Sequence, residues 1–282
     1  MKIGVLLLVG VFLNSPFHSA FAMGPKTDLE MQGLRGPVQA VVEVVEGTFI
    51  WTSHYDGQGR LTEFIVSYVD KTMFPGKEEK HVYEYDSEGK RIKAMGYAED
   101  RKVFERETYS YDDHGNRTAE IIISANGALK SASFYAYDEK GNRSSFIKYI
   151  THKLLHSTSF VHDQLGRVIR EVHYDNGVLD ADCKQTYSED AKRKDSLCYK
   201  PNGALLSKGV ERFDDSGNVI ERVNYDPAGM PVSKTTYAYQ FDATDNWIKR
   251  TFQVWHGQDG QFVLKETRTQ ERKITYHSEG KH

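Results

Sequence analysis

Apolar and aromatic side chains alternate with polar ones along most of this chain, in short runs separated by turn residues. Runs such as Thr118 to Ile123, Lys130 to Tyr137 and Glu221 to Tyr225 have the pattern and residue types of half-buried β-strands. Turns recur about every 12–14 residues, which leaves no room for a crossover helix, so neighbouring strands should be antiparallel. The pattern predicts an all-β meander of about 16–20 strands, with less than about 10% helix.

The turns follow a repeat with a period close to 26 residues. Segments of the form aromatic-Asp-x-x-Gly-polar begin at Tyr85, Tyr111 and Tyr137, and related segments begin at residues 162, 187, 213 and 241. Asp can hydrogen-bond to the backbone of its own turn, and Gly supplies the positive φ angle that closes it. A second series of turns lies midway and contains Asn-Gly at 126–127, 176–177 and 202–203. Each repeat is therefore predicted to be a strand, a turn, a strand and a turn.

Some segments depart from this pattern. Ala191 and Asp245 stand where other repeats have the turn Gly, which predicts a looser turn at the first and a normal turn at the second. Gly36-Pro37 precedes Val38 to Val45, which is predicted to be the first strand. The stretch from Lys71 to Lys80 is predicted to be an inserted loop.

The aromatic-Asp-x-x-Gly segments resemble the YD repeats of Rhs-family and cell-wall-associated repeat proteins, over roughly residues 50–250. The resemblance implies hairpin ribbons that wind into shells, often around a toxic C-terminal cargo. This chain is far too short to enclose a cargo domain. We expect a single repeat domain made of one curled antiparallel meander of YD-type hairpins. Open twisted sheets rarely exceed about ten strands, so the sheet should close or fold back.

The N-terminus has the three parts of a secretory signal, namely Lys2, an apolar run from Ile3 to Leu13, and Ala20-Phe21-Ala22 as the cleavage site. We expect a signal peptide at 1–22, a lead-in at 23–37 and the repeat domain at 38–282. The mature protein is predicted to be periplasmic or secreted, with no transmembrane segment after cleavage. The formal charge of −3 is spread without a basic cluster, which argues against a nucleic-acid partner.

Cys183 and Cys198 flank the turn at Tyr187 to Lys192 at nearly equal distances. In an exported chain, such a pair predicts a disulfide between opposed positions of adjacent strands. Two buried free thiols are the alternative.

Sequence motifs for catalysis and cofactor binding are missing, and the glycines belong to the repeat turns. We therefore expect no catalytic residues, no cofactor and no metal site. His152 and His156 are interpreted as surface histidines, because a spacing of four places strand residues about 13 Å apart. The acidic pairs Asp112-Asp113 and Asp214-Asp215 are interpreted as turn residues.

Aromatic residues are the feature with binding potential. Pairs such as Tyr83 and Tyr85, or Tyr239 and Phe241, share one face of a strand, and the repeat stacks them into ladders. Internal packing is the simpler interpretation; an exposed strip that stacks on glycans or peptides is the other. The candidate ladder consists of Tyr85, Tyr111, Tyr137, Tyr187 and Phe213.

These features predict a non-catalytic exported scaffold that binds a protein or glycan of the cell envelope. One alternative is an accessory or immunity protein of an Rhs-type toxin system. Another is an outer-membrane β-barrel, which period-two alternation suits. Charged residues on both strand faces weigh against that barrel, because a charge facing lipid costs about 2–4 kcal/mol near the midplane. They are Arg117, Glu120, Lys130, Arg170, Glu171, Lys208, Glu211 and Arg222.

Overall fold

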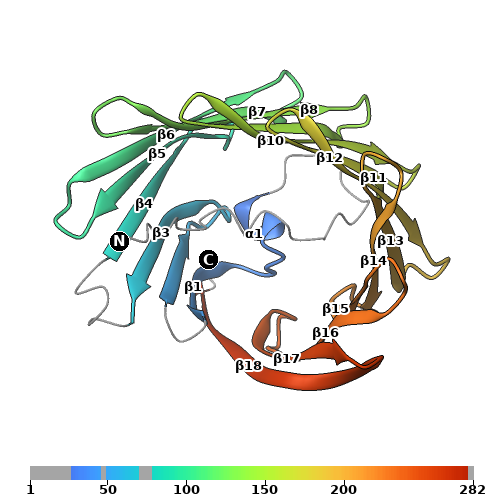
Figure 1. The fold of residues 1–282 in the computed structure, drawn as a ribbon. Helices are drawn as coiled ribbons and strands as arrows, with labels where there is room; N and C mark the ends of the chain where they lie inside the picture. The colour runs from blue at the N-terminus through green and yellow to red at the C-terminus, as the bar shows by residue number, and fades with distance from the viewer. Residues whose placement is uncertain (1–26, 46–48, 70–77, 279–282) are drawn as a thin grey trace, which may run out of the picture.

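The protein is a closed, antiparallel, 18-stranded β-barrel in the computed structural model, which describes residues 27–45, 49–69 and 78–278 (Figure 1). Strands follow one another around the wall in chain order, and β1 pairs with both β2 and the last strand, β18. The predicted all-β meander is confirmed, and its strand number lies within the predicted range. The sequence analysis expected so long a sheet either to close or to fold back, and the structure shows that it closes.

The elements, in chain order, are one short helix and the strands of the wall. They are α1 (Asp28–Met31), β1 (Val38–Val45), β2 (Phe49–Tyr55), β3 (Leu61–Tyr68), β4 (Glu78–Tyr85), β5 (Arg91–Ala98), β6 (Val103–Tyr111), β7 (Arg117–Ser124), β8 (Leu129–Tyr137) and β9 (Arg143–Ile150). They continue with β10 (Lys153–His162), β11 (Val168–Asp175), β12 (Val178–Tyr187), β13 (Arg193–Tyr199), β14 (Leu205–Phe213), β15 (Val219–Tyr225), β16 (Pro231–Phe241), β17 (Trp247–Gln258) and β18 (Gln261–Tyr276).

The repeat turns are built by their aspartates, as predicted. Asp86 Oδ1 accepts hydrogen bonds from the backbone N–H groups of Glu88 and Lys90, at 3.0 and 2.8 Å, and Gly89 adopts a φ of 82°. Asp112 and Asp214 make the same pair of bonds, which confirms them as turn residues. Each aspartate carboxylate thus bonds to two backbone N–H groups of its own turn, which favours the turn conformation and stabilises the hairpin.

The two turns without glycine differ as predicted. Ala191 adopts a φ of 56°, and the bond that closes its hairpin runs from Ser188 N to Arg193 O, one residue further than in the other repeats. This turn is therefore longer and looser. Asp245 adopts a φ of 60° and keeps the usual bond to Asp242 O, at 3.1 Å. Asp tolerates the left-handed region better than most side chains, which explains the normal turn.

Strand β1 coincides with the predicted first strand at Val38–Val45. The predicted loop at 71–80 is wrong at its end, because β4 begins at Glu78 and pairs with β3. Residues 71–77 and the proposed signal at 1–22 lie outside the described residues.

The lead-in forms α1, which lies inside the ring next to the first strands (Figure 1). Thr27 and Glu30 cap its start reciprocally. Leu29 and Leu34 pack with Val38, Tyr55 and other apolar side chains of the wall, which is where the hydrophobic core is found. No helix among the described residues is long and apolar enough to cross a bilayer.

Two further ties hold the barrel together. Asn246, only 2% exposed, accepts a hydrogen bond from Arg35 N at 2.7 Å and donates to Arg35 O and to the Tyr276 hydroxyl at 2.8 and 2.9 Å. The lead-in is thereby fastened to β18. Cys183 and Cys198 lie directly opposite each other on β12 and β13 and form a disulfide, which confirms the predicted pairing.

Candidate functional site: the lumenal wall

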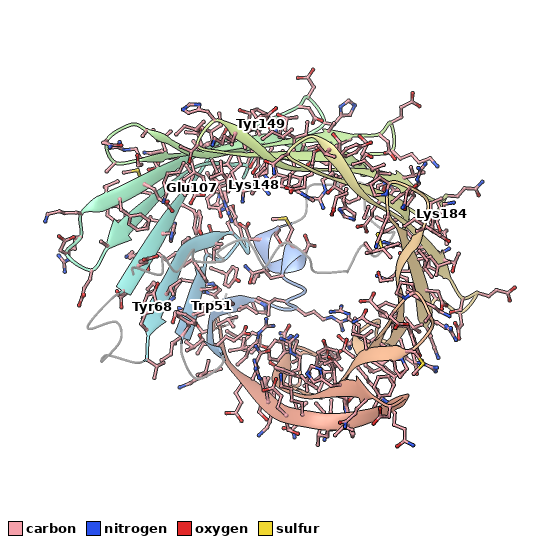
Figure 2. The ribbon with its side chains drawn as sticks, viewed as in Figure 1. Trp51, Tyr68, Glu107, Lys148, Tyr149 and Lys184 are labelled. Atoms are coloured by element: carbon pink, nitrogen blue, oxygen red, sulfur yellow. A yellow bond between two sulfur atoms is a disulfide. The ribbon has the colours of Figure 1, made fainter. Side chains whose placement is uncertain are left out.

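Alternate residues of every strand face the inside of the ring. Figure 2 shows this at β9, where Lys148 points inward and its neighbour Tyr149 points outward. Antiparallel partners share a face, so the register carries this assignment from strand to strand around the barrel. Barrels of 16–18 strands are wide enough for an aqueous lumen, which makes the inner wall the candidate site.

Most of the charged strand residues that weigh against an outer-membrane barrel face this lumen. The strand register places these residues on the lumenal face of β7, β11, β14 and β15. Lys130 forms an ion pair with Glu105, which also faces the lumen. Arg170 and Lys208 point outward. An outer-membrane barrel therefore fits better than the sequence suggested. The lumenal residues are Arg117, Glu120, Glu171, Glu211 and Arg222.

The candidate aromatic ladder lies on the lumenal wall and fastens neighbouring hairpins. The Tyr85, Tyr111 and Tyr137 hydroxyls donate to the backbone carbonyls of Leu61, Arg91 and Arg117, at 2.6, 2.7 and 2.8 Å. Tyr187 donates to Val168 O at 3.1 Å, and Phe213 lacks a hydroxyl but pairs with Val219. These contacts give the ladder a structural role; ligand binding by it stays a prediction.

Guanidinium groups stack on tyrosines that stand two residues before the ladder positions. The Arg91 guanidinium lies 4.2 Å from the Tyr83 ring centre, and Arg117 lies 5.2 Å from that of Tyr135. Burial alone would lower the pKa of Arg91, but Asp28 and the surrounding tyrosines outweigh it and raise the pKa. This half of the wall is thus filled by its own stacked side chains.

Strand β16 carries a second row of lumenal aromatic rings, in which Tyr239 donates to Val219 O at 3.0 Å, as the ladder tyrosines do to their carbonyls, and Phe241 is exposed. Tyr237 stacks on Tyr239, and Tyr239 on Phe241, with ring centres 6.5 and 5.9 Å apart. Phe252 of β17 packs beside Tyr237, and Phe241 is 41% exposed. The rings form one surface along the lumenal face, which we call the β16 row.

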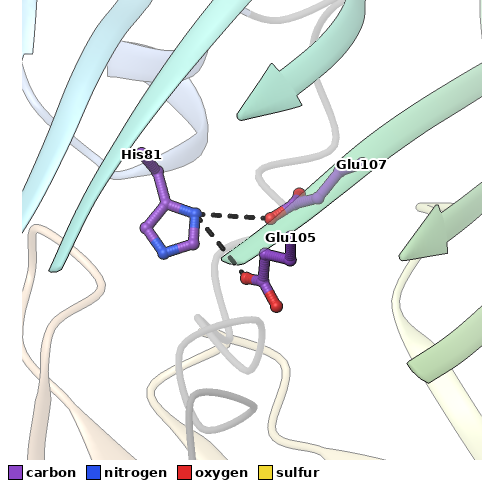
Figure 3. A group of neighbouring side chains, drawn as sticks. All are labelled: His81, Glu105 and Glu107. Carbon is purple, nitrogen blue, oxygen red and sulfur yellow. Dashed lines mark ion pairs between the residues drawn. The ribbon is translucent and has the colours of Figure 1, made fainter. Parts of the chain in front are cut away.

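A second cluster joins His81 of β4 to Glu105 and Glu107 of β6 (Figure 3). His81 Nδ1 lies 3.4 Å from Glu107 Oε1 and 3.9 Å from Glu105 Oε1, and all three residues are buried. Burial alone would raise the pKa of Glu107, but hydrogen bonds with His81 and Tyr109 outweigh it and lower the pKa. The sequence contained a signal for this group, since His81 and Glu107 are one repeat of 26 residues apart and so come to neighbouring hairpins.

A third cluster spans β10 and β11. Thr158 Oγ1 lies 2.7 Å from His156 Nε2 and 3.3 Å from His173 Nδ1, and the other nitrogen of His173 lies 3.3 Å from Glu171. The hydrogen bond with His173 is the main cause that lowers the pKa of Glu171. His156, interpreted from the sequence as a surface histidine, is half-buried and faces the lumen. His152 is exposed in the β9–β10 turn.

A shallow cavity of about 150 Å³ lies on the lumenal side of β13–β15. Its lining includes Lys194, Glu211 and Arg222, which form one ion-paired group, together with Cys198 of the disulfide. The charged side chains of this lining are already paired with one another, so the cavity offers no unpaired charge to a ligand.

The protein-family models include none that matches this chain, and the curated proteins include none that is similar to it. Among solved structures, a porin-like protein from Bacteroides uniformis is similar with a TM-score of 0.50 and 13% identity, over 86% of this chain and 98% of that one. A porin-like protein from Bacteroides vulgatus matches with a TM-score of 0.28 and 8% identity, over 86% and 99%. TcdB2-TccC3 without its hypervariable C-terminal region matches with a TM-score of 0.19 and 13% identity, over 75% and 15%.

At these identities the Bacteroides uniformis protein supports the fold alone, and the two weaker matches carry no argument. The resemblance to YD repeats of the Rhs family is therefore not confirmed. In fold alone, a closed barrel agrees with the outer-membrane barrel alternative better than with an Rhs-type scaffold.

Proposed function

We propose that this protein is an exported, non-catalytic β-barrel that binds an envelope glycan on its lumenal wall. The observation that carries the proposal is the β16 row, whose stacked rings face the lumen and are only partly covered. Sugar rings present flat C–H faces, which pack against aromatic rings while their hydroxyl groups remain free for hydrogen bonds. Arg250 and Gln270 lie next to the row and offer polar partners of that kind.

The proposal predicts that shortening the exposed rings weakens glycan binding. In titrations with N-acetylglucosamine oligomers and solubilised peptidoglycan, Tyr237→Ala and Phe241→Ala should each weaken binding about 3–10-fold, because an aromatic contact contributes about 0.5–1.5 kcal/mol. Tyr225→Ala removes a ring from the outer wall and serves as the matched control. Folded wild-type protein that binds none of these glycans, or variants that bind as tightly as the wild type, would refute the proposal.

The outer wall supports a setting in water. Ion pairs lie on the outward face of several strands, each with at least one partner within three residues of a strand end: Lys93–Glu84 at 2.9 Å, Arg170–Asp182 at 2.8 Å, Arg212–Glu221 at 3.1 Å and Lys249–Glu271 at 2.9 Å. In addition, a typical strand here has eight residues, about 27 Å, and a tilt of about 35–45° reduces its height to roughly 19–22 Å. The apolar band of membrane barrels is about 25 Å tall, so a typical strand of this wall is shorter than the band it would have to span.

The second candidate is an outer-membrane barrel, which the fold of the porin-like neighbour favours. An outward apolar stretch on β7–β9 also fits it, with Ile121, Phe134, Ile147 and Tyr149. On other strands the outward face mixes apolar and charged residues: on β14 and β15, Val210 and Val223 lie next to the Arg212–Glu221 ion pair.

Cell fractionation separates the two candidates. We expect the mature protein in the periplasmic or medium fraction after extraction without detergent, because lipid contact would leave the outward ion pairs poorly solvated. An outer-membrane porin of the same cells is the control that should stay in the membrane pellet. Release of the protein by detergent alone would refute the aqueous setting and favour the membrane barrel.

A further inference from the structure

Between β4 and β6, the lumenal face of β5 has a glycine, Gly96, whose missing side chain leaves room for side chains of the neighbouring strands. On β5, Gly96 pairs with both His81 and Glu105, while Ala94, fully buried, pairs with Tyr83 and Glu107. A Cβ atom on Gly96 would lie 2.8 Å from Glu105 Cγ and 2.9 Å from Phe104 Cζ. Glycine weakens a strand interior, and here its position lets side chains of β4 and β6 meet above β5.

The two carboxylates above Gly96 are oriented in the same way. In each carboxylate the Oε1 atom faces His81 Nδ1, and the Oε2 atom accepts a hydrogen bond from a second, outer partner. For Glu105 that partner is the Lys130 ammonium, and for Glu107 it is the Tyr109 hydroxyl. Outer hydrogen bonds of this kind orient ligands around metal ions.

His81 can hydrogen-bond to only one of the two carboxylates. Nδ1 can donate a single hydrogen, which the nearer Glu107 Oε1 accepts at 3.4 Å, so Glu105 Oε1 at 3.9 Å lies beyond hydrogen-bond distance of His81. Buried carboxylates need full partners, because the free energy cost of desolvating them is large. A divalent cation placed between the three atoms satisfies both at once.

We propose that His81, Glu105 and Glu107 bind a divalent first-row transition metal of the Zn²⁺ class. Zn²⁺ takes imidazole nitrogen and carboxylate oxygen at about 2.0–2.2 Å, so tetrahedral ligand atoms lie roughly 3.4 Å apart. The donor atoms here all lie within 4.8 Å of one another, so small side-chain rotations complete the site. Three protein ligands leave one coordination position for water or a ligand.

The site is tested on untagged, folded, metal-stripped protein titrated with Zn²⁺ alone. We expect one Zn²⁺ per chain, at least about 10-fold weaker binding in His81→Ala and Glu107→Gln, and an intermediate loss in Tyr109→Phe, which removes an outer partner. Glu171→Gln is the matched control, because it removes the carboxylate of the other lumenal His–Glu pair and should leave Zn²⁺ affinity unchanged.

Substitution with Co²⁺ gives a second measurement that does not depend on affinity. The wild type should show the visible absorption of four-coordinate Co²⁺, and His81→Ala should lose it while keeping its β-sheet circular dichroism. A folded wild type that takes up no Zn²⁺, or uptake that survives both His81→Ala and Glu107→Gln, would overturn the assignment. The result is independent of glycan binding, so either proposal can fail while the other stands.

Discussion

The Asp28→Ala variant is expected to lose about 3–5 kcal/mol of its free energy of unfolding, because it leaves a buried guanidinium without its counter-charge. Asp28 is 7% exposed, and its carboxylate accepts hydrogen bonds from the Leu61 N–H at 2.9 Å and from the Arg91 guanidinium. The Tyr85 hydroxyl oxygen, which shares its one hydrogen with Leu61 O, lies 2.6 Å from the carboxylate. These contacts join α1 to β3, β4 and β5. Chemical denaturation followed by tryptophan fluorescence measures the loss.

Two further variants separate the buried charge from general damage. Asp113→Ala removes an exposed turn carboxylate and should unfold like the wild type. The double variant Asp28→Ala/Arg91→Met should regain part of the lost stability, since the unpaired charge is removed together with its partner. If Asp28→Ala unfolds within about 1 kcal/mol of the wild type, then α1 does not anchor the lumenal wall as described.

The double variant Cys183→Ser/Cys198→Ser should lose about 3 kcal/mol, the value that the chain-entropy model gives for a loop of about 15 residues. For a protein of this size, each kcal/mol corresponds to about 2–4 °C in the melting temperature. The hairpin should still form, because β12 and β13 keep their ladder and their other neighbours. Melting curves measure the difference, and mass spectrometry of a non-reduced digest shows the linked peptides.

Reductant provides the control for this bond. It should lower the melting temperature of the wild type to that of the double variant and leave the variant unchanged. Two alkylatable thiols in natively purified wild type would contradict the pairing.

The sequence predicted local structure well because that structure depends on local chemistry. The Asp and Gly of each turn determine a hairpin without help from distant residues, so β1, the strand number and the disulfide register could be predicted. The looser turn at Ala191 and the normal turn at Asp245 were also predicted, from how well each residue tolerates a positive φ.

Closure and the lumenal clusters were harder to predict, because they depend on which face of each strand turns inward. His156 was assigned to the surface, yet the β10 register turns it to Thr158 and the lumen. His81 and Glu107 looked unrelated until the period of the repeat brought β4 and β6 to the two sides of Gly96. In such a repeat protein, residues one period apart in the sequence, rather than residues a few positions apart on one strand, indicate which side chains meet on the lumenal wall.

The pairing of β1 with β18 affects how the chain can fold. The ribosome produces β1 first and β18 last, and Val41 pairs with Ile274 across almost the whole sequence. Contacts between such distant residues form slowly, because a long loop must close before they add stability. Until then, every partly folded chain has two open sheet edges that can pair with a second molecule. Aggregation during refolding should therefore depend on protein concentration until the last strand is in place.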